Sequence, residues 1–232
     1  MEFPPLDVLY EDNHCIAVAK PAGAPSAHFD GTVETLDHAV KAYLKSKYGK
    51  PGKVFLGVVH RLDKPTSGVL LFARTSKGAA RLSEQFRAGA VEKVYWAAIE
   101  KPMPTPAGTL EDWLRKDEAI GRVDVVPSHA AGAKRALVHY NQKAIHGGLA
   151  LVELRPLTGR THQLRVQLAH RGHPIVGDFK YGSEEPFPAG IALHARSLTF
   201  LHPTRHDPIT LTADLPRSWR GRLAHLLREQ PK

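Results

Sequence analysis

The stretch HRLDKPTSGVLLFA, residues 60–73, joins a charged turn to a continuous apolar run. The apolar part predicts a strand buried in a sheet. In the turn, Asp63 stands between Arg61 and Lys64, and these opposite charges favour the ionised carboxylate, which can act as a nucleophile or a base. An aspartate at this place can equally cap backbone N–H groups before Thr66 and Ser67. The stretch alone leaves both interpretations of Asp63 open.

Composition favours an anionic partner. The 232 residues are 42% hydrophobic, enough for a substantial core, and 32 Lys and Arg against 23 Asp and Glu give a net charge of +9. Such an excess is typical of proteins that bind nucleic acid. The single cysteine, Cys15, excludes a disulfide within the chain and is expected to be a small buried hydrophobe. Without an export signal or an apolar run of about 20 residues, we expect a cytoplasmic protein that does not enter a membrane.

Local patterns predict an α+β fold with a mixed, largely antiparallel central sheet and flanking helices. The predicted helices cover 32–48, with Thr32 as N-cap, 76–88, 161–172, with Thr161 as N-cap, and 218–229. The predicted strands cover 14–20, 57–62, 68–74, 91–100, 122–126, 135–145, 149–157, 192–203 and 208–216. We expect one domain over 1–232, in which the three prolines of 101–108 mark a boundary between two lobes.

Two further stretches carry candidate site residues. Arg160, His162, Gln163 and Arg165 gather at the start of the predicted helix 161–172, where two guanidiniums and a helix N-terminus favour an anion. A capped surface helix with ordinary charges is the alternative. In EKVYWA, residues 92–97, Tyr95 could stack on a base, although buried packing is the more common role of such a residue.

Taken together, four stretches resemble the motifs of RluA-type pseudouridine synthases, in that family's order, within a likeness that runs from about residue 7 to 220. They are KPAG (20–23), HRLDKPTSGVLLFA, EKVYWA and LTGRTHQLRVQLAHRGHPIVGDFKYG (157–182). The resemblance implies the pseudouridine synthase fold with an active-site cleft between two halves. It also implies an isomerase that converts uridine in tRNA and/or rRNA to pseudouridine, with 1–232 as a single catalytic domain and without the separate N-terminal RNA-binding domain that some members carry. A monomer is the default expectation. The reaction oxidises nothing and gains no group, so neither a cofactor nor a metal is expected.

The resemblance also assigns roles to residues. Asp63 is similar to the catalytic aspartate, Arg165 to its basic partner, and Tyr95 to the aromatic residue that stacks on the target base. Arg61 resembles the arginine that enters the RNA helix in place of the flipped nucleotide, while KPAG is expected to form an architectural loop beside the site. Besides Arg61, the residues that we assign to substrate binding are His60, Thr66, Arg160, His162 and Gln163.

Two rival functions are weighed against this one. A protein of the same fold that binds RNA without catalysis would not need Asp63, Tyr95 and Arg165, all of which are present. A metal-dependent hydrolase is suggested by the histidine pairs at 170/173 and 202/206 among fourteen histidines. Neither pair has the acidic residue that known metal-binding helices place between their histidines, so no metal ligand is assigned.

Overall fold

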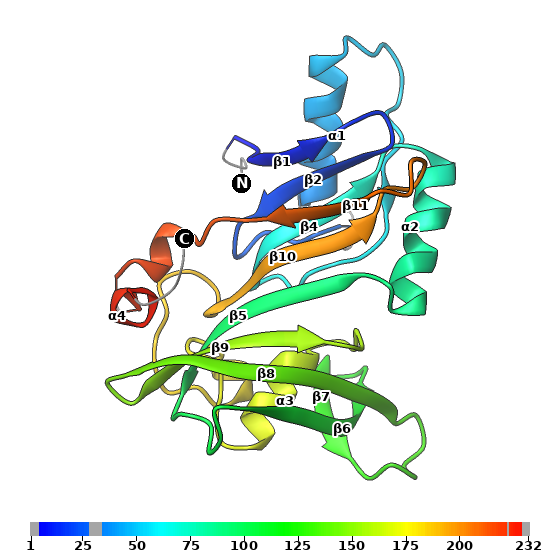
Figure 1. Cartoon of the computed structure of the whole chain (residues 1–232). Helices are drawn as coiled ribbons and strands as arrows, with labels where there is room; N and C mark the ends of the chain where they lie inside the picture. The colour runs from blue at the N-terminus through cyan, green and yellow to red at the C-terminus, as the bar shows by residue number, and fades with distance from the viewer. Residues whose placement is uncertain (1–4, 28–33, 222, 229–232) are drawn as a thin grey trace. The chain divides into compact units, whose positions relative to one another are not determined.

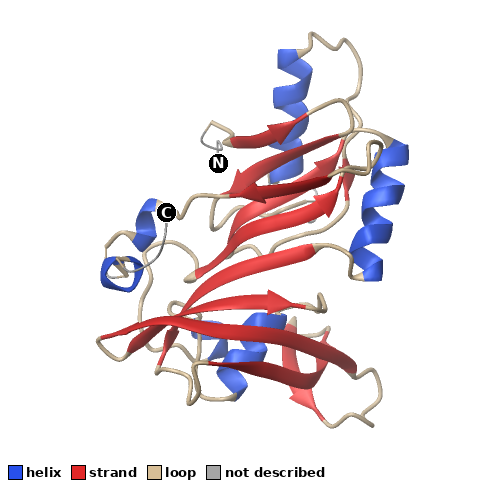
Figure 2. Ribbon diagram, viewed as in Figure 1, coloured by secondary structure: helices blue, strands red, loops and turns tan. Residues whose placement is uncertain are grey.

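The computed structural model describes residues 5–27, 34–221 and 223–228 and divides the chain into two compact units (Figure 1). The first unit comprises Met1–Glu92 and Ala195–Leu215, and the second comprises Lys93–His194 and Pro216–Lys232. Both contain antiparallel strands with helices packed on them, which confirms the predicted α+β class (Figure 2). Residues 101–108 lie inside the second unit, and the expectation of a single domain stays a prediction.

In the first unit, β2 (Cys15–Lys20) and β4 (Ser67–Ala73) pair antiparallel, with Cys15 opposite Ala73 and Lys20 opposite Gly68. All seven residues of β4 are buried, as its continuous apolar sequence predicts. Further antiparallel pairs belong to this framework: β1 (Val8–Glu11) pairs with β2, β3 (Gly57–Val58) with β4, and β10 (Leu193–Leu201) with β11 (Pro208–Thr212).

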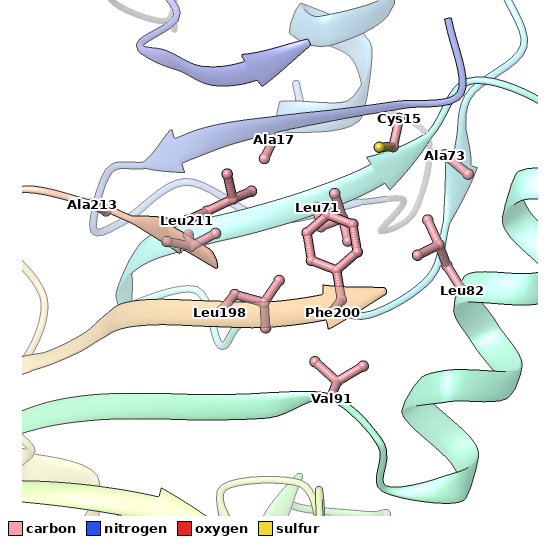
Figure 3. Packing of buried hydrophobic residues seen from close by; sticks show 11 residues of the cluster. Cys15, Ala17, Leu71, Ala73, Leu82, Val91, Leu198, Phe200, Leu211 and Ala213 are labelled. Carbon is pink, nitrogen blue, oxygen red and sulfur yellow. The ribbon is translucent and has the colours of Figure 1, made fainter. Parts of the chain in front are cut away.

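The core of the first unit forms where these strands meet α2 (Ser76–Ala88). Figure 3 shows Phe200 and Leu211 among the side chains of β2 and β4, with Leu82 of α2 at the edge of the cluster. Local signals explain the helix: the Thr75 side chain accepts a hydrogen bond from Gly78 N, and Gly89 ends the helix at φ 72°. The other helix of this unit, α1 (Leu36–Lys47), is amphipathic.

The second unit contains an antiparallel sheet with the strand order β5-β9-β8-β6-β7, in which neighbouring strands are not all consecutive in the chain. These strands are β5 (Glu92–Glu100), β6 (Ala107–Asp117), β7 (Arg122–Val126), β8 (Lys134–His146) and β9 (Leu149–Pro156). The sequence His146-Gly147-Gly148 predicts a hairpin at this place, and β8 and β9 are joined by one. Gly147 and Gly148 both adopt the positive φ that a two-residue turn of this kind requires. Helix α3 (Gln163–His170) packs against β6 and β7, and α4 (Ala224–Leu227) packs against β8 and β9.

Several predicted boundaries are wrong, each for a local reason. The strand expected over 57–62 ends at Val58, because the chain leaves the sheet to form the charged turn. Helix α1 has Thr35 as its N-cap, whereas Thr32 lies outside the described residues. Helix α3 begins at Gln163, since His162 holds a left-handed φ of 51°. In place of the helix expected over 218–229, the described residues of that range form the end of the 3₁₀ helix Arg217–Trp219 and the four-residue helix α4. None of the described helices is long and apolar enough to span a bilayer.

Candidate active site

The turn that carries Asp63 lies between β3 and β4 and is held by backbone contacts. Thr66 N donates to the carbonyl oxygen of Asp63 at 3.0 Å, which closes the turn. The residue before Asp63, Leu62, exchanges two hydrogen bonds with the Ser26 hydroxyl: Ser26 donates to its carbonyl at 2.7 Å and accepts from its N–H at 3.1 Å. Asp63 itself is half-buried, so the fixed backbone presents its carboxyl group at the edge of the unit's interior.

A buried lysine from the KPAG stretch fixes the other side of the turn. Lys20 is 1% exposed, and its Nζ donates to the carbonyl oxygens of Pro21 and Lys64, both at 3.0 Å. The Lys64 carbonyl also accepts from Gly23 N at 2.8 Å. Burial lowers the pKa of the Lys20 amine to about 7, while the charge of Asp63 acts in the opposite direction. KPAG therefore supplies a side chain next to Asp63, a function beyond the architectural loop expected from sequence.

The other predicted residues of this turn lie in different environments. Arg61 is exposed and makes no ion pair among the described residues. The Thr66 side chain is buried, and its hydroxyl has no hydrogen-bond partner within the described part of the chain, which leaves it available to a polar ligand. His60 Nε2 accepts from Leu71 N at 2.9 Å, and its ring stacks on Phe86 with 4.5 Å between centroids. These contacts of His60 favour a structural role.

In the second unit, Arg165 is held by a buried ion pair. Its Nε and Nη2 donate to the two carboxylate oxygens of Asp178 at 2.7 and 2.8 Å, a bidentate arrangement. The two side chains are 5% and 2% exposed. The Tyr181 ring lies under the guanidinium at 5.0 Å, and its hydroxyl is 2.7 Å from His162 Nδ1. Asp178 and Tyr181 thus determine the orientation of Arg165, a role that sequence reasoning missed although both lie in the quoted GDFKYG.

The polar cluster at the start of α3 serves the chain's own structure. Gln163 Oε1 accepts from the Thr158 hydroxyl at 2.7 Å and from Arg160 N at 3.1 Å, and its amide donates to Leu137 O at 3.1 Å. Arg160 Nε donates to a backbone carbonyl of β8 at 2.9 Å. The buried Gln163 therefore uses both ends of its amide group to join α3 to the sheet. The substrate contacts assigned to these residues stay predictions.

Tyr95 lies on β5 opposite Leu154 of β9 and is half-buried. Its strand neighbour Lys93 has a pKa lowered by burial. Asp63 belongs to the first unit, whereas Tyr95 and Arg165 belong to the second. The partnership of Asp63 with Arg165 stays a prediction.

Asp12, Cys15 and His202 of the first unit lie close enough together to suggest a metal site. Their donor atoms are engaged, however. Asp12 Oδ1 accepts from the N–H groups of His14 and Cys15. His202 Nδ1 accepts from Arg205 N at 2.9 Å, so its Nε2 carries the proton and donates to Asp12 Oδ2 at 2.6 Å. Burial raises the pKa of the Cys15 thiol to about 12. A hydrogen-bonded carboxylate, a protonated imidazole nitrogen and a thiol do not fit a metal ion.

Comparisons with known proteins point to one family. A family model described as RNA pseudouridylate synthase matches residues 14–170. The "Ribosomal large subunit pseudouridine synthase D" of Xylella fastidiosa is 36% identical over 91% of this chain and 66% of its own length. The "tRNA pseudouridine synthase C" of Haemophilus ducreyi is 34% identical over 92% of this chain and 93% of its own. The solved structure titled "Human RNA Pseudouridylate Synthase Domain Containing 4" matches with a TM-score of 0.80 and 28% identity, covering 97% of this chain and 95% of that one.

Proposed function

The chain belongs to the RNA pseudouridylate synthase family and is an RNA pseudouridine synthase, an isomerase, and from this premise we propose that Asp63 is its catalytic carboxylate. One observation carries the proposal: the turn of Asp63 is held from inside the protein by the buried Lys20 and by Ser26. Holding a catalytic group in place removes an entropic cost from the reaction. A surface turn with no such task would not need a buried amine.

The chemistry fits a carboxylate. The bond between N1 of uracil and C1′ of ribose breaks, the base turns, and a bond forms between C5 and C1′. C5 loses a proton and N1 gains one, so the isomerisation is balanced without an oxidant or a donor group. The two routes available to Asp63 are attack at C1′ and deprotonation of the sugar. Both need the ionised carboxylate.

Four further residues complete the proposed site. Arg165 is the basic partner of the carboxylate, and Tyr95 stacks on the target base and assists the loss of the C5 proton. Removing a base from the RNA stack costs a few kcal/mol. The exposed Arg61, which makes no ion pair among the described residues, offsets part of this cost by taking the place of the base. The Thr66 hydroxyl, buried beside the turn, donates or accepts one hydrogen bond to the substrate.

The substrate is RNA, and we propose that it is structured tRNA and/or rRNA. Support comes from the relatives' names, which specify the large ribosomal subunit in one case and tRNA in another. The net charge of +9 suits a long phosphate backbone. We further propose that the enzyme acts as a monomer in the cytoplasm, where these RNAs are found.

The test is the isosteric change Asp63→Asn, assayed by tritium release from host RNA labelled at C5 of uracil. We expect turnover to fall by about 1,000-fold or more while RNA binding survives, since only the charge of one side chain is lost. Asp7→Asn, the same change at an exposed position of the same unit, should leave the rate unchanged. Turnover retained in Asp63→Asn would refute the assignment. RNA binding by the unaltered protein without any tritium release would instead support the inactive binding protein.

A further inference from the structure

The C-terminal segment of the second unit carries a concentrated positive charge. Residues 217–232 contain five Lys and Arg and one Glu, so these sixteen residues supply four of the nine net positive charges of the chain. None of them belongs to the proposed catalytic set. Such a concentration within one short segment calls for an explanation beyond solubility.

The described part of this segment is anchored by apolar side chains that point inward. Trp219 and Leu223 are 0% exposed and Leu226 is 2% exposed. The Trp219 ring packs edge-on against Phe187 and His194, with 6.2 and 6.3 Å between centroids. Helix α4 packs against β8 and β9 of the same unit. One side of the described residues of this segment is therefore buried against the second unit, and the side chains on their other side face outward.

The side chains that face outward are cationic or aromatic. Arg217 and Arg220 are three residues apart around the 3₁₀ helix Arg217–Trp219, where side chains at this spacing eclipse each other. His225 and Arg228 are also three residues apart, on the side of α4 opposite the buried Leu226. All four are exposed. Two successive turns thus place their polar groups on one outer surface.

These arginines differ from others on the same unit. Arg122, Arg135 and Arg155 are exposed on β7, β8 and β9, and each has an acidic partner within 3.2 Å. By contrast, no described residue forms an ion pair with Arg217, Arg220 or Arg228, so their charge is not compensated locally. A cation without an internal partner is free to bind an external anion.

Two stacked histidine rings adjoin this charge. His146, at the end of β8, stacks on His225 of α4 with 4.5 Å between centroids and 18° between planes. Both are exposed. Exposed flat rings beside uncompensated arginines are the combination with which proteins bind RNA, because phosphates meet cations and bases meet rings. A membrane surface fits less well, since the apolar side chains of Trp219, Leu223 and Leu226 are buried and not presented outward.

We propose that Arg217, Arg220, Arg228, His225 and His146 form a second RNA-binding surface, here named the C-terminal basic face. It binds the phosphate backbone of the substrate RNA away from the reacting nucleotide. The proposal rests on the proposed function in taking RNA as the ligand. The surface supplies affinity and no chemistry.

The test compares two triple variants that remove the same charge. Arg217→Gln/Arg220→Gln/Arg228→Gln removes three charges from the face, and Lys45→Gln/Lys50→Gln/Lys53→Gln removes three from exposed positions of the first unit. The probe is fluorescently labelled bulk host tRNA, titrated at several salt concentrations. Each phosphate contact contributes about 0.7–0.9 to the slope of log affinity against log salt. We expect the arginine variant to lose about 2–3 from this slope and up to about 100-fold in affinity at 0.1 M salt.

The lysine variant should keep nearly the full slope, and a third variant with lysine at the three arginine positions should recover it. An unchanged slope in the arginine variant, or equal losses in both glutamine variants, would overturn the proposal. The proposal would also be overturned if the arginine variant kept its RNA binding but lost binding to vesicles of anionic phospholipid, or if the face captured an acidic protein in place of RNA. Tritium release by the unaltered protein is scored separately. If the unaltered protein binds RNA through this face but releases no tritium, the proposed catalytic function is refuted while the C-terminal basic face is still supported as an RNA-binding surface.

Discussion

The buried ion pair between Arg165 and Asp178 makes a quantitative prediction for the variant Asp178→Asn. The asparagine amide keeps the shape of the side chain but presents N–H groups to a guanidinium that also donates, so one of the two hydrogen bonds becomes a repulsive contact. The charge of Arg165 stays buried without this carboxylate. Breaking a pair that is 5% and 2% exposed should cost about 3–5 kcal/mol in the free energy of unfolding of the second unit.

Equilibrium unfolding in urea can isolate this unit, since the three tryptophans, Trp96, Trp113 and Trp219, all belong to it. With a urea dependence of about 2 kcal/mol per molar, the fluorescence midpoint of Asp178→Asn should fall by about 1.5–2.5 M. Glu111→Gln is the matched control, because it breaks the exposed pair with Arg135 in the same unit. Its midpoint should fall by less than about 0.5 M.

If the urea midpoint of Asp178→Asn falls no further than that of Glu111→Gln, the reasoning is refuted, because the buried pair would then contribute no more to stability than an exposed pair. The double variant Arg165→Met/Asp178→Leu separates charge from packing. It should be more stable than the single variant, because neither buried charge remains. If the double variant is the less stable of the two, the loss comes from packing around Tyr181 and not from an unpaired guanidinium.

Two further predictions concern the first unit. The unfolded amine of Lys20 holds its proton to higher pH than the buried amine, whose pKa burial lowers to about 7. Above pH 7 the unfolded state therefore binds more protons than the folded state, so the free energy of unfolding should rise by about 1–2 kcal/mol from pH 7 to 9. Lys20→Met should remove this rise, as measured by urea unfolding followed by circular dichroism. Parallel curves of stability against pH for the variant and the unaltered protein would contradict this prediction. Gly68→Ala should destabilise the unit by about 2 kcal/mol or more, because φ is +117° and the new Cβ would lie 2.2 Å from Ala195 O. Gly52→Ala, whose Cβ meets nothing within 4 Å, should match the unaltered protein in the same assay.

The sequence predicted what depends on local pattern. The buried strand β4, helix α2 with Gly89 at its end, and the Gly147-Gly148 hairpin follow from periodicity and backbone preferences that operate within a few residues. The family resemblance likewise identified the turn of Asp63. These features are short-range, so a single chain reveals them.

What the sequence did not predict depends on contacts between distant residues. Nothing in KPAG indicates that Lys20 reaches the carbonyl of Lys64, 44 residues later. Gln163 has the same side chain whether it binds RNA or joins a helix to a sheet, and only the fold shows that its amide meets Thr158 and Leu137. Asp178 stands thirteen residues after Arg165 and becomes its partner only once the chain turns back. Long polar side chains near a motif are therefore ambiguous until their partners are known.

The charges of the two units differ in a way that separates affinity from catalysis. The first unit carries fourteen Lys and Arg against twelve Asp and Glu, and the second carries eighteen against eleven. Attraction between charges acts over several ångströms and depends mainly on their number, whereas bond breaking depends on the position of one group. The nearly neutral unit holds Asp63 through short contacts from Lys20 and Ser26, while the basic unit contains the C-terminal basic face. Substitutions in that face should therefore change the salt dependence of the Michaelis constant and leave turnover at saturating RNA unaltered. Asp63→Asn should lower turnover at saturating RNA and leave the salt dependence of the Michaelis constant unaltered.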